Sequence, residues 1–213
     1  MKGRIMHKIG IMGGTFNPVH NGHLMLARQS YFEYKLDKVI FMPAGRPPHK
    51  QDMQILNDTD RLNMLQAAVG NTPYFEISAY EIQKNGLSYT FETLEYLHKV
   101  FEDAMLYFIM GADSVNSIET WVRPDRILRL AHILAAVRDD TDLCALDRQA
   151  RYLRQKYGGR ISLLSLPQMN ISSHEIRNLA KSGASIAHLV PQTVAAYIQN
   201  HGLYQSVPAS GNT

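Results

Sequence analysis

The sequence predicts an α/β protein with a doubly wound parallel sheet and helices on both faces. Three observations predict it. Short apolar runs alternate with helical patterns along the chain, the first run leads through a glycine pair into a helix start, and the run 104–110 is apolar throughout. Strands joined by helices pair in parallel, and a strand without polar positions is covered on both faces. The 213 residues suffice for one such domain without disulfides or structural metals.

The first half of the chain gives a β-α-β pattern that repeats. The expected elements are a strand at 8–12, a helix at 22–34, a strand at 39–42, a helix after Thr59, a strand at 74–78 and a helix at 88–101. Thr59 can cap the helix that follows it. The segment 44–57 is polar, contains two prolines and shows no period, so it predicts a long loop.

The second half continues the alternation. Strands are expected at 104–110, 132–137 and 160–166, with helices between them, a helix at 173–181 and a last helix that begins at Pro191. This is a Rossmann-like order of elements. No repeat or Ser/Gly-rich linker divides the chain, whereas its last residues have the composition of disorder. We therefore expect one domain over 1–204 and a flexible C-terminal tail at 205–213.

Composition and charge exclude several classes of protein. No apolar run approaches the roughly 18 residues that a membrane span needs, and the apolar stretch near the start is too short for a signal peptide. The net charge of +3 is spread along the chain, which suits anionic small molecules better than nucleic acid. Cys144 has no partner for an internal disulfide, so we expect a small buried residue in a cytoplasmic protein.

A glycine pair and a threonine follow the first predicted strand. The carboxyl end of a strand, at the start of a helix, is where α/β folds bind phosphates. Gly13 and Gly14 permit a close approach of the backbone, and Thr15 offers a hydroxyl to a phosphate oxygen. The spacing matches neither GxxxxGK[ST] nor GxGxxG, which disfavours phosphate-loop ATPases and simple dinucleotide binders.

Two histidines lie three residues apart at the start of the next helix. His20 and His23 therefore project from one face, beside N–H groups that have no intrahelical partner, and predict an anion cradle. One alternative is a zinc pair, but this spacing needs a third ligand, and no Cys or HExxH context supplies one. The other alternative is a capping or structural role, which suits either histidine alone better than the pair.

The segment GGTFNPVHNGHL closely resembles the HxGH signature of the nucleotidyltransferase superfamily, and ISSHEIR at 171–177 is similar to its ISSxxIR motif. Within the superfamily the chain most resembles the bacterial nicotinate-nucleotide adenylyltransferases, over about 8–204. Further matches are PAGRPPHK, SYTFETL, GADS and Trp121. Asn17 stands where the family more usually has an acid, and His174 lies within ISSxxIR. Neither departure removes a group that the chemistry requires.

The resemblance implies adenylyl transfer from ATP to nicotinate mononucleotide, which gives nicotinate adenine dinucleotide and pyrophosphate. Mg²⁺ would be carried by ATP and not by a protein metal site. One alternative is a nicotinamide mononucleotide or pantetheine-phosphate adenylyltransferase, and another is a non-catalytic nucleotide-sensing module. Three features oppose the pantetheine-phosphate enzyme, namely His20, the SYT segment and the region of Trp121. The complete set of His20, His23, Ser172 and Arg177 opposes loss of activity. We expect neither nucleic acid nor membrane as a partner, and a homo-oligomer stays open.

The motifs and the resemblance together assign roles to individual residues. The catalytic residues are His20, His23 and Arg177. The ATP-binding residues are Gly13, Gly14, Thr15, Gly111, Asp113, Ile171, Ser172 and Ser173. The acceptor-binding residues are His49, Lys50, Ser88, Tyr89, Thr90 and Trp121. Plainer alternatives are an ordinary capped helix for Ser172 and Arg177, helix caps for Asp113 and Thr90, a core position for Trp121 and a solvated loop for His49 and Lys50.

Overall fold

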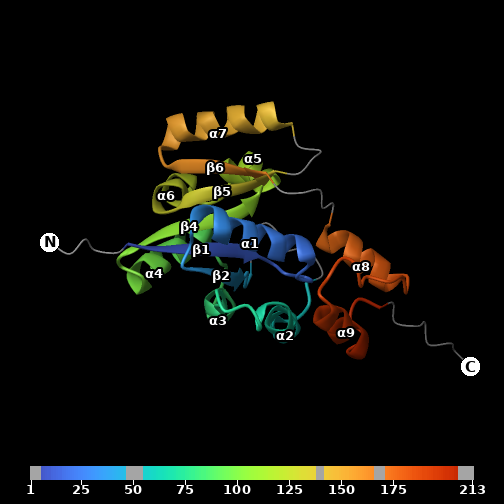
Figure 1. Cartoon of the computed structure of the whole chain (residues 1–213). Coiled ribbons are helices and arrows are strands. Elements are labelled where there is room, and N and C mark those ends of the chain that lie inside the picture. The colour runs from blue at the N-terminus through green and yellow to red at the C-terminus, as the bar shows by residue number, and fades with distance from the viewer. Residues whose placement is uncertain (1–5, 47–54, 138–141, 166–170, 206–213) are drawn as a thin grey trace, which may run out of the picture.

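A six-stranded parallel sheet forms the centre of the protein (Figure 1). The computed structural model describes residues 6–46, 55–137, 142–165 and 171–205. The strands are β1 (His7–Gly14), β2 (Lys38–Pro43), β3 (Phe75–Ile77), β4 (Ala104–Gly111), β5 (His132–Val137) and β6 (Arg160–Ser165). Their order is β3-β2-β1-β4-β5-β6, so successive strands are added toward one edge of the sheet up to β3 and toward the other edge from β4 onward. This confirms the doubly wound α/β prediction and marks the β1/β4 junction as the expected ligand site.

Helices cover both faces of the sheet and bury a separate core on each. One face carries α1 (Asn21–Tyr34), α2 (Asp58–Val69), α8 (Ser173–Lys181) and α9 (Gln192–Asn200). The other carries α4 (Thr90–Val100), α5 (Ala112–Ser117), α6 (Pro124–Leu130) and α7 (Leu143–Tyr157). The short α3 (Tyr80–Gln83) and the 3₁₀ turn η2 (Ile118–Thr120) complete the described elements. None of these helices is long and apolar enough to cross a membrane.

The central strand β4 is buried on both faces, as its unbroken apolar run predicts. Side chains alternate along a strand, so Tyr107 and Ile109 join the core under α1 while Phe108 and Met110 join the core under α4. The two cores therefore meet at β4. The pairing of β4 with β1 runs to Met12 opposite Ile109, so the carboxyl ends of the two strands lie side by side.

Three local predictions need correction. The first strand does not stop at Met12 but runs through the glycine pair, since Gly13 and Gly14 pair with β2. Thr59 does not cap α2, because the helix begins one residue before it and the Asn57 side chain accepts a hydrogen bond from the Asp60 N–H at 2.8 Å. Cys144 is exposed, not buried, because it lies in the first turn of α7 on the side away from the core.

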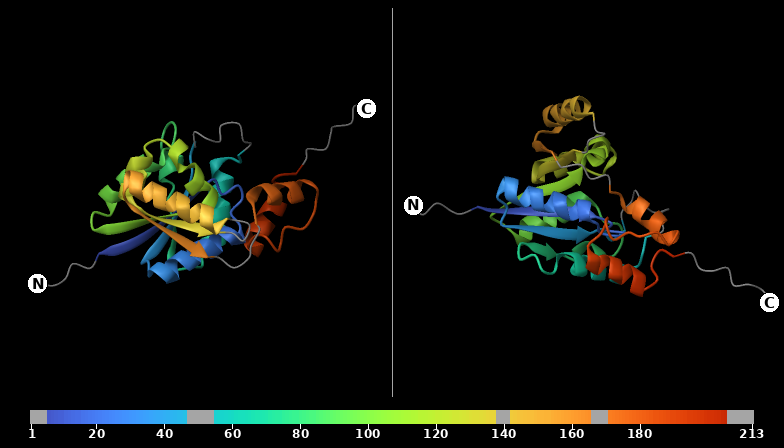
Figure 2. Two further views of the ribbon diagram at one scale, coloured as in Figure 1. Left: turned by 90° about the horizontal axis from the view of Figure 1, so that it is seen from above. Right: turned by 45° about the vertical axis from the view of Figure 1, so that its right-hand side comes forward.

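The C-terminal helices α8 and α9 lie beside the carboxyl end of β1 (Figures 1 and 2). Ser172 caps α8 as expected, accepting a hydrogen bond from the Glu175 N–H at 3.1 Å. The Ser173 hydroxyl donates to the Pro18 carbonyl at 2.9 Å, which joins the second motif to the first. Most of the expected tail lies outside the described residues, so the tail at 205–213 and the domain boundary at 204 stay predictions.

Candidate active site

The loop between β1 and α1 is tied to the C-terminal end of the described chain. Asn17 is buried, and its Oδ1 accepts hydrogen bonds from the Tyr204 hydroxyl at 2.9 Å and from the Leu56 N–H at 3.3 Å. Burial raises the pKa of the Tyr204 phenol above its usual range, so the hydroxyl keeps its proton at neutral pH and remains a donor. The amide oxygen of Asn17 thus accepts the hydrogen bonds that a carboxylate would accept at this position.

Two arginines, Arg61 of α2 and Arg177 of α8, donate hydrogen bonds to backbone carbonyls of the same loop. Arg61 is almost fully buried, and its Nη1 donates to the carbonyls of Thr15 at 2.9 Å and Ala44 at 2.8 Å, joining the ends of β1 and β2. Its Nη2 pairs with the Asp58 carboxylate, which is half exposed. Arg177 donates from Nη1 to the Asn17 carbonyl at 2.8 Å. Two guanidinium groups therefore bring positive charge to the phosphate-binding turn that the sequence predicts.

His20 and His23 cap α1 reciprocally. The Nδ1 of His20 accepts a hydrogen bond from the His23 N–H at 3.4 Å, and the Nδ1 of His23 accepts one from the His20 N–H at 3.3 Å. The two rings stack with their centroids 3.6 Å apart. A ring nitrogen that accepts a hydrogen bond carries no proton, so in the neutral tautomer both rings carry it on Nε2.

This arrangement tests the capping alternative for the histidine pair. Both side chains do project from one face, as predicted, and the capping alternative is confirmed. Capping uses the Nδ1 atoms and leaves the proton of each neutral ring on Nε2. Each ring therefore has an Nε2–H group of the kind that donates a hydrogen bond to an anion. The anion cradle itself stays a prediction. Among the described residues, no three His, Cys, Asp or Glu side chains are grouped so that they could hold a metal ion.

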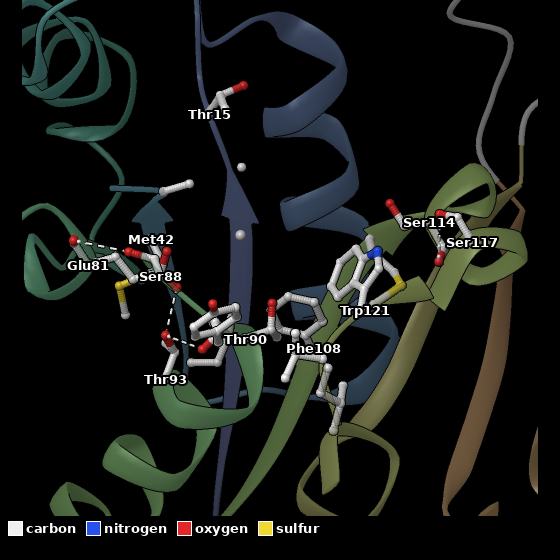
Figure 3. A pocket seen from close by; sticks show the side chains of 18 of the residues that line it. Thr15, Met42, Glu81, Ser88, Thr90, Thr93, Phe108, Ser114, Ser117 and Trp121 are labelled. Carbon is white, nitrogen blue, oxygen red and sulfur yellow. Dashed lines mark hydrogen bonds between the residues drawn. The ribbon is translucent and has the colours of Figure 1, made fainter. Parts of the chain in front are cut away.

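A cavity of about 430 Å³ opens at the carboxyl ends of β1 and β4 (Figure 3). Its position is the β1/β4 junction at which doubly wound sheets bind ligands. In Figure 3, Thr90 and Phe108 lie between Trp121 on one side and Ser88 with Glu81 on the other. The predicted site residues that line the cavity are Gly13, Gly14, Thr15, Ser88, Tyr89, Thr90, Gly111 and Trp121.

The cavity wall includes the start of α4, whose N-cap residue makes no capping bond through its side chain. Tyr89 is the N-cap residue of α4 and makes no side-chain capping bond, and Thr90 is the first helical residue, so the cap alternative for Thr90 is wrong. Helix starts of this kind attract anions through their N–H groups. Trp121 packs against the core and also lines the cavity, meeting Phe108 edge to face at 6.5 Å between centroids. Its indole therefore has a ligand-sized space beside it.

Other predicted residues lie outside this cavity, at the junction of α8 with the β1–α1 loop. His20, His23, Ser172, Ser173 and Arg177 surround that junction and do not line the cavity. The side chain of Ile171 is in the core, so it can offer only its backbone to a ligand. Asp113 is exposed and is the second residue of α5, whose N-cap is Gly111, so it does not cap that helix. His49 and Lys50 lie outside the described residues.

Sequence reasoning missed four residues that shape the site. Arg61 shares a buried face of α2 with Met64 and Leu65, three and four residues later, and this helical spacing was a usable signal. Glu81 and Thr93 line the cavity through contacts between different helices, which no local pattern reveals. Tyr204 sits at the end of the predicted domain and reaches Asn17 only through the fold.

Comparison with known proteins identifies the family. The sequence model of the cytidylyltransferase-like family matches residues 11–179. A protein of Lachnoclostridium phytofermentans is 41% identical over 93% of this chain and 100% of its own length, and it carries the name "Probable nicotinate-nucleotide adenylyltransferase". The chain belongs to the nicotinate-nucleotide adenylyltransferase family. A second member of that name, from Moorella thermoacetica, is also 41% identical, over 93% of this chain and 92% of its own.

Solved structures share the fold of this adenylyltransferase family member. The nicotinic acid mononucleotide adenylyltransferase of Plasmodium falciparum, solved in complex with NaAD, superposes with a TM-score of 0.76. The alignment covers 93% of this chain and 97% of that one at 17% identity. A second structure, from Vibrio parahaemolyticus, gives a TM-score of 0.67 at 20% identity over 95% of this chain and 98% of its own. At such identities the likeness concerns the fold.

Proposed function

We propose that the chain transfers the adenylyl group of ATP to nicotinate mononucleotide, which forms nicotinate adenine dinucleotide and pyrophosphate in NAD biosynthesis. The observation that carries the proposal is the cavity at the β1/β4 junction, which joins an uncapped helix start and an indole to a glycine-rich turn. A pyridine carboxylate and a phosphate fit its two ends. The names of the curated relatives, at about 40% identity over nearly their whole length, support the same reaction.

The acceptor's ring would occupy the end of the cavity at α4. The N–H groups and the hydroxyl at Tyr89 and Thr90 are donors, which both oxygens of a ring carboxylate can accept. The indole of Trp121 can stack on the pyridine ring, which contributes about 1 kcal/mol beyond burial. The acceptor phosphate then extends toward Gly13 and Gly14, which line the cavity and carry no side chain of their own.

The transfer needs no general base in this proposal. A phosphate oxygen of the acceptor is already ionised at pH 7, so in-line positioning and stabilisation of the charge on the phosphoryl oxygens carry catalysis. The Nε2–H donors of His20 and His23 would contact the α-phosphate. The capped start of α8 and the Arg177 guanidinium would hold the leaving pyrophosphate. Mg²⁺, which arrives with ATP, supplies charge neutralisation of the triphosphate.

Arg177 has a structural task before it has a catalytic one. Its Nη1 holds the Asn17 carbonyl, but a guanidinium has five N–H donors, so one bond to the loop leaves capacity for phosphate oxygens.

We further propose the cytoplasm, where ATP is made, as the place of the reaction. The reactants in this proposal are small molecules, with no part for nucleic acid or a membrane.

An acceptor panel tests the function. The purified protein is incubated with MgATP and, in separate reactions, nicotinate mononucleotide, nicotinamide mononucleotide and pantetheine phosphate, and pyrophosphate release is followed against a reaction without acceptor. We expect release with nicotinate mononucleotide and, by mass spectrometry, one adenylylated product. Release with pantetheine phosphate alone would assign the chain to another member of the superfamily, and no release with any acceptor would contradict an enzymatic role.

A further inference from the structure

Glu81, near the start of α3, joins three segments of the cavity wall. Its Oε1 accepts a hydrogen bond from the Thr93 hydroxyl of α4 at 2.7 Å (Figure 3). Its carboxyl group also accepts one from the Gly45 N–H, just after β2. Its backbone carbonyl accepts a bond from the Ser88 hydroxyl at 3.3 Å. Thr93 and Ser88 are buried. One residue therefore connects the end of β2, α3 and the first turn of α4.

The contact between Glu81 and Gly45 is unusually close. A Cβ atom built on Gly45 would lie 2.1 Å from the Glu81 carbonyl oxygen, a distance at which no side chain fits. The carboxyl group is kept at this place against a desolvation penalty, since burial raises its pKa although Thr93, Gly45 and Lys84 all favour the charged form. A group held at an energetic cost beside a cavity is a candidate for a functional role.

We propose that Glu81 is a positioning residue for the acceptor, which holds the start of α4 at the orientation in which its N–H groups meet the ring carboxylate. The inference rests on the proposed function. Glu81 acts through Thr93 and Gly45, and it makes no bond to the reacting phosphates. Its removal therefore affects acceptor binding and leaves the phosphoryl transfer step intact.

The Thr93 hydroxyl explains how the carboxyl group can orient the helix. The hydroxyl has one proton and lies 2.7 Å from Glu81 Oε1 but 3.4 Å from the Tyr89 carbonyl one turn earlier. Glu81 thus draws the proton away from the backbone. Without Glu81, or without the Thr93 hydroxyl, α4 loses this bond to α3. The turn that holds Tyr89 and Thr90 is then no longer fixed relative to the rest of the cavity wall.

Steady-state kinetics on the full chain tests this role. The variants are Glu81→Ala, Thr93→Val, the double variant, and Glu81→Gln, whose amide oxygen keeps one of the two acceptor functions. Glu95→Gln is the matched control, because Glu95 is on the same helix and pairs with Arg126 of α6, and neither residue lines the cavity. We expect the KM for nicotinate mononucleotide to rise about tenfold in each alanine or valine variant. The kcat and the KM for ATP should stay within about twofold.

Coupling between the two residues is the decisive readout. The double variant should be no worse than Glu81→Ala, because Glu81→Ala already removes the bond that Thr93→Val removes, and Glu81→Gln should recover part of the loss. An unchanged acceptor KM in Glu81→Ala, equal losses in the KM for both substrates, or additive effects would overturn the proposal. Should Glu81→Ala not fold, Thr93→Val alone decides it. A wild-type protein that does not use nicotinate mononucleotide contradicts the proposed function instead, and the variants are then measured with the acceptor it does use.

Discussion

Replacing Arg61 by Met removes the buried guanidinium that joins β1 to β2. The perturbation deletes two hydrogen bonds to carbonyls, those of Thr15 and Ala44, and the pair with the half-exposed Asp58 carboxylate, which contributes little because it is open to solvent. A hydrogen bond to a charged group contributes about 1.5 to 3 kcal/mol, so the two together give about 3 to 6 kcal/mol. Against this, the Nε of Arg61 is buried without a partner among the described residues, and its removal returns about 1 to 2 kcal/mol. We expect a net loss in the free energy of unfolding of about 1 to 5 kcal/mol.

Urea unfolding followed by the fluorescence of Trp121 measures this loss, with ATP turnover as the functional readout. Arg151→Met is the matched control, because the Arg151 side chain is 69% exposed and pairs with Asp147 one turn earlier on α7. An exposed pair of this kind contributes less than about 0.5 kcal/mol. Arg61→Lys should fall between the two, since an ammonium keeps the charge but lacks the fork. A loss below about 1 kcal/mol in Arg61→Met would refute the reasoning, because the two carbonyls would then not depend on the guanidinium.

Three further predictions concern the histidine cap, the tight contact at Gly45 and pH. His20→Asn keeps a good N-cap side chain but loses the Nε2–H donor, so turnover should fall by about a hundredfold at nearly constant melting temperature; a large loss of stability would contradict this. Gly45→Ala must shift the Glu81 backbone by about 1 Å, so the KM for the acceptor should rise. A KM equal to that of wild type would count against the positioning role of Glu81. Burial, aided by the charge of Arg160, lowers the pKa of His132 from 6.5 to about 4. Between these two pH values His132 is protonated in the unfolded chain but neutral in the folded chain, so wild-type stability falls as pH drops from 6.5 toward 4. His132→Phe should flatten that fall in thermal melts, and parallel curves would show that another group causes it.

The fold was predictable because its signals are local. Each strand from 104–110 to 160–166 is a short apolar run, and helix 173–181 begins after a side chain that caps it, so its bounds match the structure. The predicted end of the first strand was wrong because Gly13 and Gly14 have weak strand propensity, while pairing with β2 keeps them in the sheet. Tertiary pairing overrode the local preference. Cys144 was misplaced because residue type predicts burial only on average.

The candidate site was predictable only in part. The two motifs gave the residues at the starts of α1 and α8, and the structure brings them together through Ser173 and Arg177. No pattern in the sequence shows that Glu81 meets Thr93, since that bond depends on how α3 packs against α4. The histidine pair shows a different limit. Sequence reasoning treated capping and anion binding as alternatives, whereas the ring geometry lets the Nδ1 atoms cap and keeps a donor on each Nε2.

The ratio of kcat/KM for nicotinate mononucleotide to that for nicotinamide mononucleotide, at fixed MgATP, tests the central claim most directly. The two acceptors differ only in carboxylate against carboxamide, and the start of α4 offers donors to that group. A carboxylate accepts on both oxygens, whereas the carboxamide turns an NH₂ toward a donor, and a buried donor left without a partner costs about 1 to 3 kcal/mol. We therefore predict a preference for nicotinate mononucleotide of at least about tenfold. Equal values, or a preference for the amide, would contradict the assignment of Tyr89 and Thr90 to the ring carboxylate.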